Sequence, residues 1–198
     1  TRAGFLRFDD DRFATEDGLV RIQARLATSP DPRERAALAE WYARVARQLD
    51  LAPQAVQLAL ASPHTEVRRT LTEALVRAPE AQLRPLHGLL SDPDPGTRMA
   101  VLVLVARSQS PDRAAKLLSA LSDVAPEVRA TALQNLRILA VEAPVHALVD
   151  DPSPQVRLQA ALYLKRHEPD TFREISGVLG SDADPTVRRT VSGTTPAR

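Results

Sequence analysis

Residues 150–157 read D-D-P-S-P-Q-V-R, and residues 181–188 read S-D-A-D-P-T-V-R. Two close variants, S-D-P-D-P-G-T-R and S-D-V-A-P-E-V-R, begin at Ser91 and Ser122, and looser ones begin at Ser62 and Ser29. The final arginines of these motifs are spaced 33, 30, 31, 28 and 31 residues apart, at Arg35, Arg68, Arg98, Arg129, Arg157 and Arg188. A period of about thirty residues indicates an internal structural repeat.

Each motif contains the signals that start a helix. A proline stands three residues before the final arginine in five copies, at Pro32, Pro95, Pro126, Pro154 and Pro185. Proline is favoured in the first helical turn because the amide there needs no partner. The residues before four of these prolines are N-cap candidates, namely Asp31, Asp94, Ser153 and Asp184.

Apolar residues on both sides of the motif predict two helices per repeat. Around and after Arg129, residues Val128, Ala132, Leu133 and Leu136 share the spacing of one helix face. Before the motifs, shorter apolar helices are expected over 82–90, 111–121, 143–149 and 171–179. Because two short amphipathic helices cannot bury their apolar faces alone, we expect neighbouring repeats to stack.

The sequence therefore predicts an all-α fold, a right-handed α-solenoid (superhelix) of about six helix pairs over residues 17–192. Residues 1–16 are expected to form an irregular N-terminal segment or cap. Residues 193–198 follow helix-ending Ser192 and are expected to form a C-terminal tail.

Composition narrows the class of protein. Apolar residues make up 43% of the chain, as in ordinary globular proteins. The formal net charge is +1, so the overall charge does not indicate binding to a nucleic acid or an anionic membrane. The absence of cysteine excludes disulfides and thiolate sites. No apolar run is long enough to span a membrane, and we expect a cytoplasmic protein. Export stays an alternative, because a leader could precede Thr1.

The repeats resemble HEAT repeats, particularly the bacterial phycobilisome-lyase-like kind, over roughly residues 17–192. The resemblance implies an aspartate and arginine ladder that joins successive repeats. Mapped onto this chain, it pairs Asp92 with Arg98, Asp123 with Arg129, Asp151 with Arg157, and Asp182 with Arg188. Ser29 and Ser62 replace the aspartate in the first two repeats, so the ladder is expected to be weaker there.

A second set of arginines recurs near the ends of the second helices. These are the candidate partner-binding residues Arg44, Arg77, Arg107 and Arg166, with Arg137 displaced by one position. They are expected either to complement the helix dipole and pair with Glu40 and Glu73, or to form a basic stripe on a concave face. Trp41 and Tyr163 share a repeat position where core or inter-helix packing is the favoured interpretation. Partial exposure, which would let either anchor a partner, is the alternative.

No residue pattern points to catalysis, a metal ion or another cofactor. The four histidines are dispersed without the spacing of metal ligands, and the acidic run 9–11 lacks the glycine and the distal glutamate of a calcium loop. Neither a nucleophile elbow nor a phosphate loop occurs. We therefore expect a protein that is not an enzyme.

Three functions remain open at this stage. The first is a non-catalytic protein-protein interaction scaffold that binds a protein or peptide partner along its concave face. The second is binding of a nucleic-acid backbone by the arginine stripe, which is disfavoured by the small number of aromatic residues. The third, a bilin lyase-like role, is implied only by the resemblance.

Overall fold

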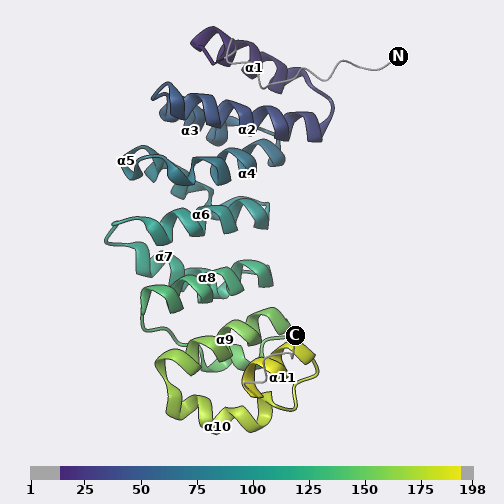
Figure 1. Cartoon of the computed structure of the whole chain (residues 1–198), viewed down its shortest axis with the longest axis vertical. Coiled ribbons are helices and arrows are strands. Elements are labelled where there is room, and N and C mark those ends of the chain that lie inside the picture. Colours follow the sequence, from purple (N-terminus) through teal and green to yellow (C-terminus); the bar gives the residue numbers. More distant parts are fainter. Residues whose placement is uncertain (1–13, 193–198) are drawn as a thin grey trace, which may run out of the picture. The chain divides into compact units, whose positions relative to one another are not determined.

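The computed structural model describes residues 14–192, and every regular element within that range is a helix (Figure 1). The chain divides into two compact units, with the boundary between Leu104 and Val105 inside helix α6. The first unit holds α1 (Glu16–Thr28), α2 (Pro32–Gln48), α3 (Ala52–Ala61), α4 (Thr65–Ala74), the 3₁₀ turn η2 (Leu75–Arg77), α5 (Glu80–Leu83), η3 (Arg84–Ser91) and most of α6 (Pro95–Arg107). The second holds α7 (Arg113–Ser119), η4 (Ala120–Ser122), α8 (Pro126–Leu139), η5 (His146–Asp150), α9 (Pro154–His167), α10 (Pro169–Leu179) and α11 (Pro185–Ser192).

Helix pairs stacked on helix pairs form the core of the first unit. Helix α1 packs on α2, α3 packs on α4, and α2 lies along α4 of the next repeat (Figure 1). Leu38, Val45, Val56 and Leu71 meet in this interior and are each at most 2% exposed. Burial of such a side chain contributes about 1.5–3 kcal/mol, so contacts between repeats carry much of the stability.

The second unit is built in the same way. Helix α8 packs against α9, and η5, α10 and α11 also contact α9. Leu133, Leu136 and Leu164 are fully buried, while Ala161 and Leu179 belong to a smaller cluster with Val187 of α11. The all-α solenoid class expected from the sequence is thus confirmed, whereas the right-handed superhelix stays a prediction.

The second helices begin where the prolines predict. Asp31 caps α2 by accepting a hydrogen bond from the Arg33 amide at 2.9 Å. Asp94 accepts one from the Thr97 amide at 2.7 Å, and Asp184 accepts one from the Thr186 amide at 2.7 Å. Ser153 occupies the N-cap position of α9, but its side chain makes no capping hydrogen bond.

Two of the first helices differ from the expected ones by forming 3₁₀ segments. Pro85 has no amide hydrogen, and the expected helix over 82–90 continues from Arg84 as a 3₁₀ segment. The expected helix over 143–149 starts three residues later, as the 3₁₀ segment η5 from His146, and residues 143–145 are not helical. Ala140, with a φ of 54°, ends α8 in the left-handed conformation, and the repeat that follows is the shortest.

The two ends of the chain fall partly beyond the described range. The irregular segment expected over 1–16 lies outside it up to residue 13, and α1 begins at Glu16, one residue earlier than the array was expected to begin. The acidic run 9–11 and the expected tail 193–198 also lie outside the described residues.

The difference between Asp94 and Ser153 gives a test of the helix starts. We expect Asp94→Ala to lower the free energy of unfolding by about 1 kcal/mol, because the Thr97 amide loses its acceptor. Ser153→Ala is the matched control and should change it little. Urea denaturation followed by far-UV circular dichroism measures both, and equal losses would contradict this account.

Candidate binding surface

The turns that precede the second helices are held by the arginines that end each motif, called here the ladder arginines. Each donates a hydrogen bond from Nη1 to the backbone carbonyl oxygen six residues earlier, at 2.5–3.2 Å. The pairs are Arg35 with Ser29, Arg68 with Ser62, Arg98 with Asp92, Arg129 with Asp123, Arg157 with Asp151, and Arg188 with Asp182. The motif arginine therefore closes its own turn.

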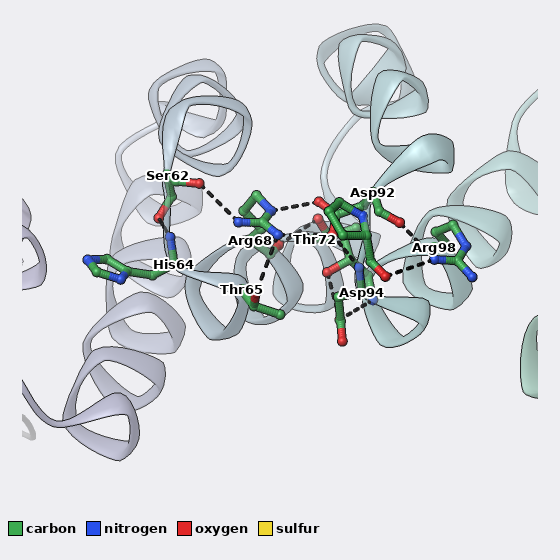
Figure 2. Close-up of polar contacts among 10 residues, drawn as sticks. Ser62, His64, Thr65, Arg68, Thr72, Asp92, Asp94 and Arg98 are labelled. Carbon is green, nitrogen blue, oxygen red and sulfur yellow. Dashed lines mark hydrogen bonds and ion pairs between the residues drawn. The ribbon is translucent and has the colours of Figure 1, made fainter. Parts of the chain in front are cut away.

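The residue that opens each turn makes a second local contact. The Asp92 carboxylate accepts a hydrogen bond from the Asp94 amide at 2.9 Å (Figure 2), and Asp151 accepts one from the Ser153 amide at 2.8 Å. Ser62 replaces the aspartate in an earlier repeat, and its hydroxyl accepts from the His64 amide at 3.2 Å. Such side-chain contacts two residues along stabilise the turn before the helix.

The aspartate carboxylates also join one repeat to the next. Arg68 donates from Nε and Nη2 to Asp92 at 2.6 and 3.0 Å (Figure 2). The same bidentate contact joins Arg129 to Asp151 at 2.9 and 2.8 Å, and Arg157 to Asp182 at 2.7 Å for both bonds. Asp92, Asp151 and Asp182 are only 3%, 6% and 6% exposed at their side chains.

This geometry corrects the pairing expected within a repeat. The contacts of Arg98 with Asp92, Arg129 with Asp123, Arg157 with Asp151 and Arg188 with Asp182 run through the aspartate backbone oxygen. The carboxylates of Asp92, Asp151 and Asp182 instead bind the arginine of the preceding repeat. The physical reason is that a guanidinium has two donor edges, and one edge is already used by its own turn.

The junction between Arg35 and the next repeat also has an ion pair, although the motif aspartate is replaced there. Ser62 offers no carboxylate to Arg35, but Glu66, four residues later, forms the salt bridge in its place. The weaker ladder expected from Ser29 and Ser62 is therefore not found at this junction.

The ladder lowers the pKa of its carboxyl groups. Burial alone would raise the pKa of Asp92, but hydrogen bonds from Arg68 and from the Asp94 amide hold it below its ordinary value. The pKa of Asp151 is lowered in the same way, by Arg129 and the Ser153 amide against the effect of burial. For Asp182, the hydrogen bond from Arg157 is the main cause of the lowered pKa.

A double-mutant cycle on Arg68 and Asp92 tests the junction. We expect Asp92→Ala to lower the free energy of unfolding by about 3 kcal/mol, because it leaves a mostly buried guanidinium without its carboxylate. Arg68→Ala should cost a similar amount. The double variant should cost clearly less than the sum, as measured by urea denaturation, and additive losses would show that the two side chains do not interact.

The lowered pKa values predict acid sensitivity. A carboxyl group with a lowered pKa in the folded state stabilises the fold above its unfolded pKa, near 4, and loses this contribution as pH falls further. The free energy of unfolding should therefore decline below about pH 4. Asp182→Asn should be less stable at neutral pH and lose less on acidification, so an unchanged acid profile would exclude this role of Asp182.

A surface cavity of about 510 Å³ lies in the first unit, on α2 and on the end of α4 with η2. The polar and aromatic residues that line it are Glu40, Trp41, Arg44, Arg47, Glu73 and Arg77. Arg44 and Arg77 are exposed and hold equivalent positions, nine residues after the ladder arginines Arg35 and Arg68. Because α2 and α4 pack side by side, the repeat brings these two candidate residues together.

The remaining candidate arginines belong to the second unit. Arg107 ends α6 and Arg166 lies near the end of α9, and both are exposed. Arg137 is half-buried, and its Nε atom is buried without a hydrogen-bond partner. Of these three candidate arginines, two are therefore exposed and one is half-buried.

The two aromatic candidates are both buried. Trp41 is 5% exposed and forms part of the cavity wall. Tyr163 is 2% exposed, its hydroxyl donates to the Val141 carbonyl at 2.7 Å, and its ring lies 4.9 Å from that of His167. Of the two interpretations, core packing of Tyr163 is confirmed and its partial exposure is not, and its hydroxyl finds a partner in the interior.

Three lining residues carry charges that the repeat pattern did not single out as a site. Arg47 follows Arg44 by three residues and faces the same cavity, a spacing that places both on one helix face. Glu40 and Glu73 were expected only as local partners for Arg44 and Arg77. In the part of the chain that the structure describes, no salt bridge joins Glu73 to Arg77.

Residues 52–137 match a family model for HEAT repeats. This part of the chain consists of HEAT repeats. The match begins with the first residue of α3 and extends to Arg137 in α8, so it includes the turns of Arg68, Arg98 and Arg129. HEAT repeats generally serve as protein-interaction scaffolds. No curated protein matches the chain.

The described residues offer neither a membrane span nor a metal site. No helix among residues 14–192 is long and apolar enough to cross a membrane. Within the same range, no three histidine or acidic side chains gather as a metal site would require. The chemistry that the HEAT-repeat surface does offer is recognition of charge, by guanidinium and carboxylate groups around an aromatic wall.

Proposed function

We propose that this HEAT-repeat protein is a non-catalytic interaction scaffold that holds a protein partner along its second helices. One observation carries the proposal: the repeated arginines Arg44 and Arg77 line a single cavity with Trp41. Stacked repeats offer such surfaces without needing a catalytic centre. Arginine and tryptophan are also the residues that most often dominate the binding energy of protein interfaces.

Binding of a nucleic-acid backbone is the second candidate, because the cavity holds three arginines. A phosphate backbone is uniformly negative, and cations around it gain affinity by releasing its counterions. Glu40 and Glu73 line the same cavity and would repel such a ligand. The mixed charge therefore favours a polypeptide.

The bilin lyase-like role and the cytoplasmic location remain predictions from the sequence. The matching family model is described only as HEAT repeats, which says nothing of a tetrapyrrole. Incubation with a bilin and an acceptor protein, followed by absorbance, is the direct test of the first.

Site-directed photo-crosslinking in cells that make the protein tests the scaffold function. A photoreactive amino acid at Ala37, an exposed cavity residue on α2, should give discrete adducts that protease removes and nuclease does not. The control position is Val20 on α1, which is 67% exposed and lies outside the cavity.

The charge of the cavity provides the second control. Adding Arg77→Glu should reduce the Ala37 adducts by about tenfold, because the loss of one charged contact is worth roughly 1.5–3 kcal/mol. Adducts that nuclease removes would support the nucleic-acid candidate instead. Equal adducts from Ala37 and Val20 would show nonspecific contact and overturn the proposed surface.

A further inference from the structure

We infer that the cavity on α2 and α4 binds a short peptide segment that carries both charges, with an acidic side chain on Arg77 and Arg47 and a basic one on Glu73. The inference rests on the proposed function and adds the chemistry of the partner. Its basis is a set of charges in the cavity that the described part of the chain leaves without partners.

Arg77 and Glu73 are the first of these charges. Both are exposed, and they stand four residues apart, a spacing at which helical side chains of opposite charge can pair. Among residues 14–192, neither side chain has a hydrogen bond or a salt bridge. The ladder arginines Arg68, Arg129 and Arg157, in contrast, all bind carboxylates through two bonds.

Arg47 supplies an independent observation in the same cavity. Its side chain is half-buried, and its Nε atom is buried with no hydrogen-bond acceptor within the described residues. Buried polar groups in proteins almost always have a partner, and each exception needs an explanation. A carboxylate is the acceptor that best matches a guanidinium, and the ladder of this chain shows that pairing repeatedly.

The shape of the cavity limits the size of the ligand. Trp41 and Ala74 hold equivalent positions, six residues after Arg35 and Arg68, and both line the cavity. A large side chain on one helix thus stands beside a methyl group on the next, which leaves the hollow. Its volume of about 510 Å³ is that of a small-ligand pocket and suits a few side chains of an extended segment.

The sum of the charges decides between the ligand classes. Arg47 and Arg77 line the cavity together with Glu40 and Glu73, so a ligand of one sign would be attracted by one pair and repelled by the other. A peptide with an acidic and a basic residue complements both sets. The buried Trp41 face gives the methylene groups of the longer side chains an apolar wall.

The experiment is a selection of random displayed peptides on the immobilised full chain, followed by fluorescence anisotropy with the synthetic consensus peptide. The selected sequences should share one acidic and one basic residue at a fixed separation. Arg77→Glu should weaken the consensus peptide by at least about tenfold. Arg33→Gln, which changes an exposed arginine on α2 outside the cavity, is the matched control and should bind unchanged.

A charge exchange makes the test specific to the pairing. The double variant Glu73→Arg with Arg77→Glu should prefer the peptide whose acidic and basic residues are exchanged, and the natural chain should reject that peptide. Ala74→Trp fills the hollow without changing charge and should also weaken binding by at least about tenfold. Circular dichroism of each variant confirms that it is folded.

Several results would overturn the inference. These are a consensus without paired charges, no selected peptide at all, a double variant that keeps the original preference, or competition by oligothymidylate as strong as by the peptide. The photo-crosslinking experiment at Ala37 shows separately whether any protein binds to this surface. Protein adducts there, combined with any of these results, would leave the scaffold function standing and remove only the mixed-charge partner.

Discussion

The contact on which the rest of the structure depends is the guanidinium of the ladder arginine, which is shared between two repeats. Its Nη1 group closes its own turn on a backbone oxygen, and its other edge binds the carboxylate that opens the next turn, as in Arg68 with Ser62 and Asp92. That carboxylate in turn holds the amide of its own N-cap residue. One ionic group thus sets the local turn and the distance to the next helix pair. The side-by-side packing of α2 and α4, and with it the cavity, follows from this spacing.

Much of this fold was predictable from the sequence because each repeat contains the local signals that start its own second helix. A proline with a capping residue before it marks a helix start wherever it occurs, and each such helix begins at its proline. The direction of the ladder was not predictable in the same way. Asp151 is six residues from Arg157 and 22 from Arg129, and the nearer charge looks like the natural partner until the two edges of the guanidinium are placed in space. The late start of η5 at His146 was not predicted, because apolar residues alone cannot show that Ala140 adopts the left-handed conformation before it.

Only those residues of the candidate site that recur at one position of successive repeats could be predicted from the sequence. Arg44 and Arg77 recur at one repeat position, so the pattern marked them, and helix packing brought them together. Arg47 has no counterpart in the period and was missed, although its spacing from Arg44 was a usable signal. Trp41 and Tyr163 hold equivalent positions and are both buried, but the groups that surround them differ. Val141, which accepts the Tyr163 hydroxyl, lies in a non-helical connection that no periodic pattern describes.

The orientation of the ladder gives the array a polarity. In the salt bridges of Arg68 with Asp92, Arg129 with Asp151 and Arg157 with Asp182, the cation comes from the earlier repeat and the anion from the later one. A duplicated or exchanged repeat would therefore carry a matching donor on one side and a matching acceptor on the other. Head-to-tail lengthening of such a chain needs no newly invented interface, whereas joining two repeats in the opposite sense would set like charges against each other. The junction of Arg35 with Glu66 shows that the acceptor can move by one helical turn and still preserve this sense.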